Sequence, residues 1–249
     1  MEITGISLSL LEMPAEYTQE YNRWHDLDHV VEHLARPGVV AGRRYVAPIG
    51  LQGLDGVQTG ELGHPPYAMI YFFGGAPDFA SEEAAENARA TDRRLNKEGR
   101  FWRPGSAPYS ALWRLVSAVA RPSVLVSPAA VPHLAHRGII IALGRAPSAD
   151  QYGKAVTWWE QSHVPDLMAV PGLLAAMRFE GVDASQSEQL LHVLLCEDPP
   201  ELVMAGIEQV KRTKRATGRY PAFGGVYESL AFLPYQRVIP LQYDFQVGD

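Results

Sequence analysis

The stretch YNRWHDLDHVVEHLARPGVVAGRRY, residues 21–45, recurs without a gap 134 positions later as AVTWWEQSHVPDLMAVPGLLAAMRF, residues 155–179. Several uncommon residue types coincide in the two copies. The aligned pairs are Trp24 and Trp158, His29 and His163, Ala35 and Ala169, Pro37-Gly38 and Pro171-Gly172, and Arg44 and Arg178. Chance seldom produces such a register, and a repeat of half the chain length outranks other signals of architecture. The sequence therefore predicts two copies of one domain, joined head to tail.

Each copy shows the same order of predicted elements: strand, helix, two strands, second helix, final strand. The segments are 3–13, 15–35, 39–47, 67–75, 79–97 and 108–119 in the first copy, and 137–144, 148–169, 173–182, 190–198, 200–216 and 223–233 in the second. Pro-Gly ends the first helix of both copies, and Ser148 is a predicted N-cap. The order β-α-β-β-α-β is that of a ferredoxin-like fold.

A ferredoxin-like domain leaves one apolar sheet face bare, and that face must be covered. Two copies in one chain can cover each other. We therefore predict an α+β protein in which two tandem ferredoxin-like domains, 1–118 and 137–249, form one α/β barrel. The connection between them, residues 119–136, holds three prolines and few charges, as linkers do.

Composition excludes several classes of protein. The net charge of -6 over 249 residues disfavours nucleic acid as a partner, and the basic run KRTKR at 211–215 is expected to be a solvated helix end. No apolar run approaches membrane-spanning length and the N-terminus lacks a basic leader, so we expect no membrane association and a cytoplasmic location. Cys196 is the single cysteine, and its apolar surroundings predict a buried, inert thiol.

Both copies carry W-x4-H-V-x-[ED]-x-[LM]-A-x-P-G ahead of a strand with an Arg-aromatic pair. This motif and the element order resemble the dimeric α/β-barrel superfamily, and specifically its EthD-like members. HVPDLMAVPG, residues 163–172, is the closer match, because HVVEHLARPG, residues 29–38, lacks the proline. The resemblance implies a fold with a small-molecule pocket. It implies no single reaction, because the superfamily includes isomerases, cyclases, monooxygenases and haem enzymes.

His29 and His163 are the histidines that the copies share. An imidazole titrates near neutrality and suits a general acid or base. On an ideal helical wheel, however, His29 lies opposite the apolar residues Leu27, Val31 and Leu34, which by itself indicates solvent exposure. A proline at 165, aligned with 31, can change the helical phase. A structural contact in each copy and a position lining a site therefore both stay open for the shared histidine.

The first copy alone has histidines at 25 and 33, which with His29 make an H-x3-H-x3-H stripe that also holds Asp26. Side chains four apart share a helix face, so two of these imidazoles could bind a metal ion. A zinc site usually draws further ligands from another element, and the sequence identifies none. We therefore predict a polar helix face without a metal, with His25 and Asp26 near the mouth of a pocket.

Arg44 and Arg178 follow Pro-Gly on the second strand of each copy. A guanidinium there could hold a substrate carboxylate or enolate, or could pair with Glu32 or Asp166 of its own copy. Its recurrence favours the structural ion pair. The loop GRFWRPGSAP, residues 99–108, either covers a pocket or simply connects two elements.

Many aromatic residues surround these positions, which favours an apolar or aromatic ligand. The predicted catalytic residues are His29, His25, Asp26 and Arg44. The predicted substrate-binding residues are Tyr21, Trp24, Tyr45, Tyr71, Trp102, His163, Trp158 and Arg178.

The sequence lacks G-x-G-x-x-G, a Walker loop and G-x-S-x-G, so no cofactor and no serine nucleophile are predicted. The leading hypothesis is a cofactor-independent enzyme that moves a proton on an apolar aromatic, lactone or polyketide-like substrate, in an isomerisation, cyclisation or elimination. His29 would be the acid or base, and Arg44 or a tyrosine would stabilise oxyanion charge. The alternatives are a haem-binding or cofactor-free monooxygenase and a non-catalytic binding protein. The tandem could also form a homodimer.

Overall fold

Eight antiparallel strands close into one barrel in the computed structural model, which describes residues 1–75, 78–220 and 227–245. The strands are β1 (Gly5–Glu12), β2 (Val39–Val46), β3 (Tyr67–Phe73), β4 (Ser106–Ala120), β5 (Gly138–Arg145), β6 (Leu173–Gly181), β7 (Gln189–Cys196) and β8 (Glu228–Arg237). Their order around the barrel is β1-β3-β2-β8-β5-β7-β6-β4. The predicted fold is confirmed. Of the final predicted strand, residues 223–226 lie outside the described residues.

The two copies join through the edges of their sheets. One seam is long: β4 pairs with β6 from Trp113, opposite Gly181, to Ala120, opposite Ala175. The other is short, since β2 meets β8 at Tyr45, opposite Arg237, and at the next residue pair. Pairing an edge strand of each copy with an edge strand of the other removes the exposed backbone groups that an open sheet would present.

The barrel interior is filled with side chains and holds the main hydrophobic core. Alternate residues of β1 and β5 point inward and are at most 1% exposed; these residues are Ile6, Leu8, Leu10, Ile139, Ile141 and Leu143. A strand alternates its side chains between two faces, so the other residues of each strand face outward. Those outer faces are covered by helices, and the spaces available to a ligand lie there.

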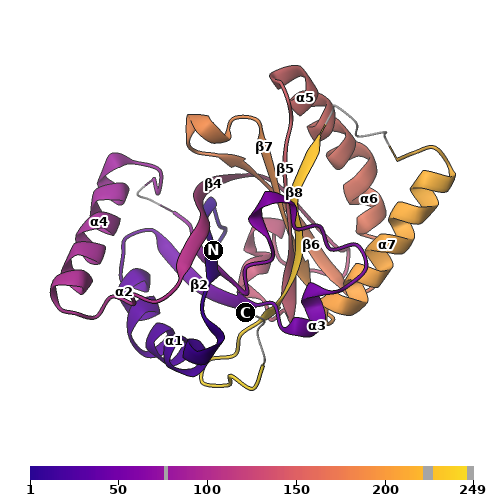
Figure 1. Cartoon of the computed structure of the whole chain (residues 1–249). Coiled ribbons are helices and arrows are strands. Elements are labelled where there is room, and N and C mark those ends of the chain that lie inside the picture. Colours follow the sequence, from indigo (N-terminus) through magenta and orange to yellow (C-terminus); the bar gives the residue numbers. More distant parts are fainter. Residues whose placement is uncertain (76–77, 221–226, 246–249) are drawn as a thin grey trace.

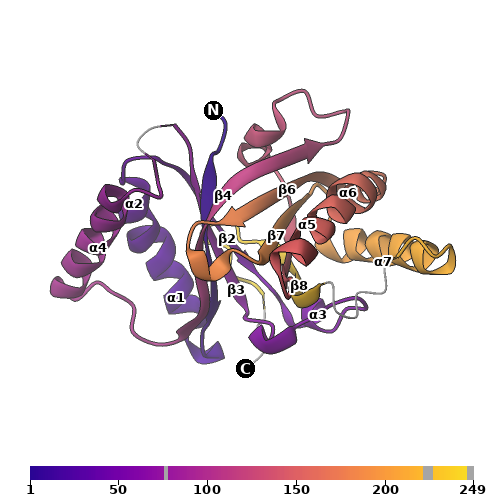
Figure 2. The same cartoon turned by 90° about the horizontal axis from the view of Figure 1, so that it is seen from above.

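The helices are η1 (Ala15–Tyr17), α1 (Thr18–Trp24), η2 (His25–His29), α2 (Val30–Leu34), α3 (Ile49–Gln52), η3 (Gly60–Leu62), α4 (Glu82–Lys97), η4 (Pro128–His133), α5 (Ala149–Trp158), η5 (Trp159–His163), α6 (Val164–Leu167), η6 (Ala184–Gln186) and α7 (Pro200–Ala216). On one side of the barrel lie α1, α2 and α4 of the first copy, and on the opposite side lie α5, α6 and α7 of the second (Figures 1 and 2). The short α3 of the first copy lies beside β8, on the side of the second copy. Within the described ranges, no helix is both long and apolar enough to span a membrane.

The predicted helix boundaries are present in the structure. The Ser148 side chain accepts a hydrogen bond from the backbone N–H of Gln151, as an N-cap does. Gly38 and Gly172 have φ of 80° and 76° after their helices, a conformation that glycine adopts without strain. The predicted linker contains the last two residues of β4 and the 3-10 helix η4.

Both copies contain a π-helical turn at the same point of the repeat, η2 and η5. In an α-helix, residues five apart lie about 140° apart around the axis. The wider π turn brings them to one face. Trp24 therefore stacks on His29, with ring centroids 4.5 Å apart, and Trp158 stacks on His163 at 4.6 Å.

The ideal-wheel expectation of exposed histidines was wrong. His25 is 3% and His33 6% exposed, whereas the apolar Leu27 and Val31 are 54% and 58% exposed. The histidines and the apolar residues lie on opposite sides of the helix, as the wheel has them, but tertiary packing turns the histidine side toward the outer face of the sheet. Proline is not the cause, since the first copy has valine where the second has Pro165.

Candidate functional site

A cleft of about 400 Å³ lies in the first copy, between the outer face of β1 and β3, the α1–η2 helix and the loop before β4. Its volume falls in the range of small-molecule pockets. Its lining consists of Ser9, Leu11, Met13, Tyr21, Trp24, His25, His29, Met69, Tyr71 and residues 101–107. We call it the first-copy cleft.

Aromatic rings form one end of the first-copy cleft. The ring centroids of Tyr21, Trp24 and Trp102 lie between 5.7 and 6.0 Å from one another. The indole N–H of Trp24 donates to the backbone oxygen of Arg100 at 2.7 Å, and that of Trp102 points at the sulfur of Met13 at 3.1 Å. These contacts hold the loop against the helix. The loop GRFWRPGSAP therefore forms a wall of the cleft.

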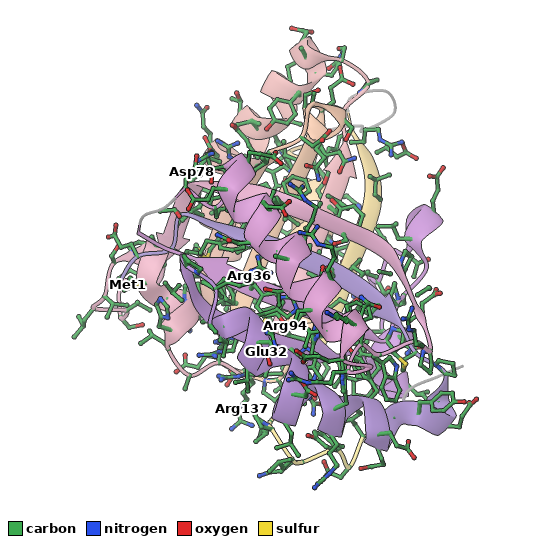
Figure 3. All side chains as sticks on the ribbon, turned by 90° about the vertical axis from the view of Figure 1, so that its left-hand side faces the viewer. Met1, Glu32, Arg36, Asp78, Arg94 and Arg137 are labelled. Atoms are coloured by element: carbon green, nitrogen blue, oxygen red, sulfur yellow. The ribbon has the colours of Figure 1, made fainter. Side chains whose placement is uncertain are left out.

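Ion pairs fasten the same loop from outside. Arg100 pairs with Glu32 at 2.6 Å and with Asp28, where Nε and Oδ2 are 3.1 Å apart. Glu32 also pairs with Arg94 of α4, and Figure 3 shows the two side chains side by side. Each exposed pair contributes little alone, but this shared network restrains the loop that carries Trp102.

Three imidazoles form a row along the helix, which we call the histidine row: His25, His29 and His33. Their ring centroids are 5.5 Å and 4.3 Å apart. Burial lowers the pKa of His25 to about 4, that of His29 to about 2 and that of His33 to about 4, and nearby positive groups add to the effect. All three are therefore neutral near pH 7. The Nδ1 of His33 accepts from Arg36 at 2.8 Å, which leaves its proton on Nε2.

Several buried polar atoms at the first-copy cleft have no hydrogen-bond partner within the described ranges. They are both ring nitrogens of His25, Nδ1 of His29 and the hydroxyls of Tyr21 and Tyr71. Buried polar groups in folded proteins are nearly always bonded, so such a cluster calls for an explanation. These atoms have almost no exposed surface, so a ligand with polar groups would supply the missing partners by displacing the side chains around them.

Burial also raises the pKa of Tyr21 and of Tyr71 above the ordinary value of a phenol. Both hydroxyls therefore keep their protons at neutral pH and remain hydrogen-bond donors. The first-copy cleft thus offers neutral nitrogen bases and hydroxyl donors together, within walls that are otherwise mainly apolar.

Arg44 lies behind the first-copy cleft in a buried ion pair. Its Nη2 is 2.7 Å from Oδ1 of Asp26, and its Nη1 donates to the backbone oxygen of Asn22 at 3.2 Å. Burial alone would raise the pKa of Asp26, but the His25 ring, the hydroxyl of Tyr243 and the Arg44 charge lower it to about 2. Neither Asp26 nor Arg44 lines the cleft.

The second copy repeats this pair, since Arg178 Nε is 2.8 Å from Glu160 Oε1. The partners of the two arginines are thus the aligned residues 26 and 160. They are not Glu32 and Asp166, which pair with other cations. Eighteen positions separate acid and arginine in both copies, so the repeat preserves a helix-to-strand ion pair.

His25 and Asp26 are adjacent without being bonded. Nδ1 of His25 is 3.8 Å from Oδ1 of Asp26, which is beyond hydrogen-bond distance. Asp26 therefore contributes charge near the histidine row but does not fix the orientation of an imidazole.

The structure thus brings six of the predicted site residues to the first-copy cleft: Tyr21, Trp24, His25, His29, Tyr71 and Trp102. Tyr45 lies in the barrel interior, where its hydroxyl is 2.8 Å from Nε2 of His136. Trp158 and His163 line a smaller cavity of about 250 Å³ in the second copy, and Arg178 lines neither space.

Sequence reasoning missed Met13, Met69, Phe101 and Arg103 as lining residues. Nothing in the sequence distinguishes the two methionines from core residues. Phe101 and Arg103 belong to the loop already noted for its aromatic and basic residues, so that loop was the available signal. In the described part of the chain, no group of three or more His, Cys, Asp or Glu side chains has metal-binding geometry.

Comparisons with known proteins support the fold and leave the function open. No protein-family model matches the chain, and no curated protein matches it in sequence. A monooxygenase candidate from Fusobacterium nucleatum superposes with a TM-score of 0.50 at 11% identity, over 97% of this chain and 98% of that one. A chlorite dismutase candidate superposes with a TM-score of 0.52 at 13% identity, over 96% of both chains.

An anthrone oxidase-like protein has a TM-score of 0.47 at 13% identity, over 96% of this chain and 92% of that one. The likeness to the two neighbours with TM-scores of 0.50 and 0.52 supports the α+β barrel fold of this chain. At such identity the likeness concerns the fold alone, and function must be argued from the site.

Proposed function

We propose that the protein is a cofactor-independent enzyme that removes a proton from an apolar, aromatic or lactone-like substrate bound in the first-copy cleft. The observation that carries this proposal is the set of neutral, unpartnered imidazole nitrogens of His25 and His29 beside the unpartnered hydroxyls of Tyr21 and Tyr71. Burial makes these imidazoles weak bases in the free protein, but an enolate formed beside one would stabilise the imidazolium and let it accept the proton. A phenol hydroxyl can donate to the developing oxyanion. The apolar walls select a largely apolar substrate.

In the proposed step, a C–H bond next to a substrate carbonyl breaks. His29 takes the proton, with His25 as the second candidate base, and the electron pair moves to the carbonyl oxygen to form an enolate. Tyr21 and Tyr71 donate hydrogen bonds to that oxygen. Return of the proton to another atom completes an isomerisation, and attack of the enolate carbon within the substrate gives a cyclisation.

Arg44 then acts as a positioning residue. Its guanidinium is engaged by Asp26 and by the backbone of Asn22, so a tyrosine takes the oxyanion-stabilising role. The ion pair holds the helix that carries the histidine row against β2. The EthD-like relationship, suggested by the duplicated H-V…P-G motif, belongs to this proposal as well.

Deuterium exchange tests the proposal without knowledge of the product. Aromatic ketones, anthrones and lactones are incubated with the protein in D2O, and loss of the acidic C–H signal is followed by NMR. The substitutions His29→Gln and His25→Gln should each slow the exchange by a factor of roughly 10² to 10⁴, which is the usual contribution of a positioned base. The matched control is His163→Gln, which alters the aligned histidine of the second copy. Full activity of the double variant H25Q/H29Q would exclude both histidines as the base.

A cofactor-free monooxygenase is the second candidate. The neighbour with a TM-score of 0.50 over 97% of this chain is a monooxygenase candidate, and the first-copy cleft is an apolar space of the kind in which O2 can react. The enolate carbon would add O2, and the resulting hydroperoxide would lose water, so that a CH2 group and O2 give C=O and H2O. An oxygen electrode separates this outcome from isomerisation, which consumes no O2.

Two further alternatives remain to be tested alongside. The first of them is haem binding. Arg103 is the one cationic side chain in the described lining of the first-copy cleft, whereas a haem carries two propionates. These residues therefore fit a haem poorly. A Soret band after addition of haemin would favour that alternative. Tight ligand binding without product or isotope exchange would indicate a non-catalytic binding protein.

A further inference from the structure

Another cavity, of about 500 Å³, lies near the short seam between the copies, where β5 begins, β8 ends and α7 starts. Its lining consists of His136, Arg137, Pro199, Pro200, Glu201 and residues 236–240. It shares no residue with the first-copy cleft. We call it the seam cavity.

Two arginines, Arg137 and Arg237, line the seam cavity, and Arg43 lies near Arg237 on β2 without lining the cavity. We call the three the arginine cluster. The backbone N–H of Arg237 donates to the backbone oxygen of Arg137 at 2.8 Å, so these two residues are cross-strand neighbours. Arg237 also lies opposite Tyr45 on β2, two residues from Arg43. Side chains at opposite and diagonal positions of paired strands lie close enough to interact.

The arginine cluster has no carboxylate within ion-pair distance in the part of the chain that the structure describes. Arg43 donates from Nη1 to the backbone oxygen of Gly42 at 3.0 Å, and its Nε is buried without a partner. Burial, together with the nearby charge of Arg237, lowers the pKa of Arg43. Like charges held together repel one another, and a bound anion would relieve that repulsion.

The other groups at the seam cavity leave its positive charge in place. His136 is neutral near pH 7, because burial lowers its pKa to about 4, and both its nitrogens are engaged by Tyr45 and by the backbone oxygen of Leu134. Glu201 is the one acid of the described lining, on the exposed first turn of α7. The start of this 17-residue helix adds the positive end of its dipole. Figure 3 shows Arg137 at the edge of the molecule, open to solvent.

Most of the remaining lining is apolar. It consists of Pro199, Pro200, Val238, Ile239 and Pro240, together with one polar residue, Gln236. A free inorganic ion would bind the arginines and leave the apolar side chains exposed to water, whereas a ligand with a hydrocarbon part would bury them.

We propose that the seam cavity binds an organic anion, a carboxylate or phosphate monoester that carries a short apolar chain. The guanidinium groups of Arg137 and Arg237 hold the anionic head, a geometry suited to both carboxylate and phosphate oxygens. Arg43 adds charge from β2, and the proline, valine and isoleucine side chains hold the chain. This site is separate from the first-copy cleft and does not depend on the function proposed for it.

Isothermal titration of the full-length protein with hexanoate, n-hexyl phosphate and the uncharged hexanol tests the site. We expect hexanol to bind at least tenfold more weakly than the better of the two anions, and the better anion identifies the preferred head group. Arg137→Gln and Arg237→Gln should each weaken that anion roughly tenfold, as loss of a charge-assisted hydrogen bond does. Arg145→Gln is the matched control, because Arg145 is an exposed arginine at the far end of β5.

Failure of both anions to bind the wild-type protein would overturn the proposal, and so would equal binding of hexanol. Unchanged affinity in the double variant R137Q/R237Q would do the same. Since Arg237 is only partly exposed, circular dichroism checks that its variant is folded. If the Arg237→Gln variant is not folded, Arg137→Gln still tests the site, because Arg137 is exposed. Binding should also weaken as NaCl rises, because the contact is ionic.

Discussion

The rings of Trp24 and His29 stack with their centroids 4.5 Å apart, although the two residues are five positions apart in a helix. That contact exists because the turn between them is a π turn, and the aligned pair Trp158 and His163 repeats it at 4.6 Å. The most conspicuous feature of the duplicated motif, a tryptophan five residues before a histidine, is therefore the signature of a shared π turn.

Deleting Leu27 tests the role of this turn. The deletion makes His29 the fourth residue after Trp24, and an α turn places residues four apart on one face. Because a π turn accommodates one extra residue, the Trp24–His29 stack and the position of His33 should survive in an α turn, and the free energy of unfolding in urea should fall by no more than about 1.5 kcal/mol. A loss of roughly 3 kcal/mol or more would show that the π turn itself is needed for packing. Leu27→Ala is the control. It keeps the turn and trims a side chain that is 54% exposed, so it should change stability by less than about 0.5 kcal/mol.

The two duplicated ion pairs should differ in their contribution to stability. Asp26→Asn leaves the Arg44 guanidinium, 5% exposed, without its carboxylate, and should destabilise the fold by about 3–5 kcal/mol. The aligned change Glu160→Gln should have an effect below about 1 kcal/mol, because that carboxylate is exposed and Arg178 keeps Glu180. Urea titration of both variants provides the comparison, and equal effects would contradict it.

Acid should destabilise the protein at a pH where carboxylates are still ionised. Burial lowers the folded-state pKa of His25 to about 4, below the ordinary value near 6.5. Between these values the unfolded chain binds a proton that the folded chain does not, so stability falls as pH falls through this window. Between pH 7 and pH 5, the free energy of unfolding of the His25→Asn variant should therefore fall by about 2 kcal/mol less than that of the wild type. Above pH 7.5 the two curves should run parallel.

Asp26 acts in a lower pH window. Its folded-state pKa of about 2 lies below the ordinary value, so its stabilising effect is present above about pH 4 and is lost as pH falls toward 2. In Asp26→Asn this second acid step should be reduced. Stability measured by urea unfolding at pH 4.5 and pH 3 separates it from the histidine step.

Gly5 should not tolerate a methyl group. A Cβ there would lie 2.6 Å from the backbone oxygen of Trp113 and 2.2 Å from the Phe79 ring. The backbone oxygen cannot move away cheaply, so Gly5→Ala should cost about 1–3 kcal/mol. Gly50→Ala, in helix α3 with nothing within 4 Å of the new methyl, should be neutral or stabilising. Thermal denaturation of the pair measures the difference.

Cys196 should report on global unfolding. The thiol is fully buried and burial raises its pKa, so the native protein should not react with a disulfide reagent such as DTNB. The labelling rate in urea should follow the unfolded fraction. Rapid reaction of the native state would show that β7 opens locally.

Most of the fold could be predicted from the repeat. The duplicated motif, the Pro-Gly helix ends and the alternating strands predicted a pair of β-α-β-β-α-β units, and each predicted strand appears within a few residues of its expected position. The site could be predicted in part. Six of its residues stood out as histidines or aromatics, whereas Met13 and Met69 carry no signal that separates a cleft wall from a core.

The wheel failed for a physical reason. It placed the histidines opposite Leu27 and Val31, as the structure does, but a wheel cannot tell which side of a helix packs on the sheet. Here His25 and His33 are buried, and Leu27 and Val31 face solvent. The partner of Arg44 was misplaced for a related reason. Across a helix and a strand, the choice between Asp26 and Glu32 depends on helix phase, which local sequence does not specify.

The sequence alone determined that the chain is a duplicated α+β unit, because periodicity, turn residues and self-similarity are local properties of the chain. The tertiary structure decided that His25 and His29 line the first-copy cleft, that Arg44 is tied to Asp26, and that Arg137 and Arg237 meet at one cavity. These are contacts between residues distant in sequence. They follow from barrel closure and strand register, which no single segment encodes.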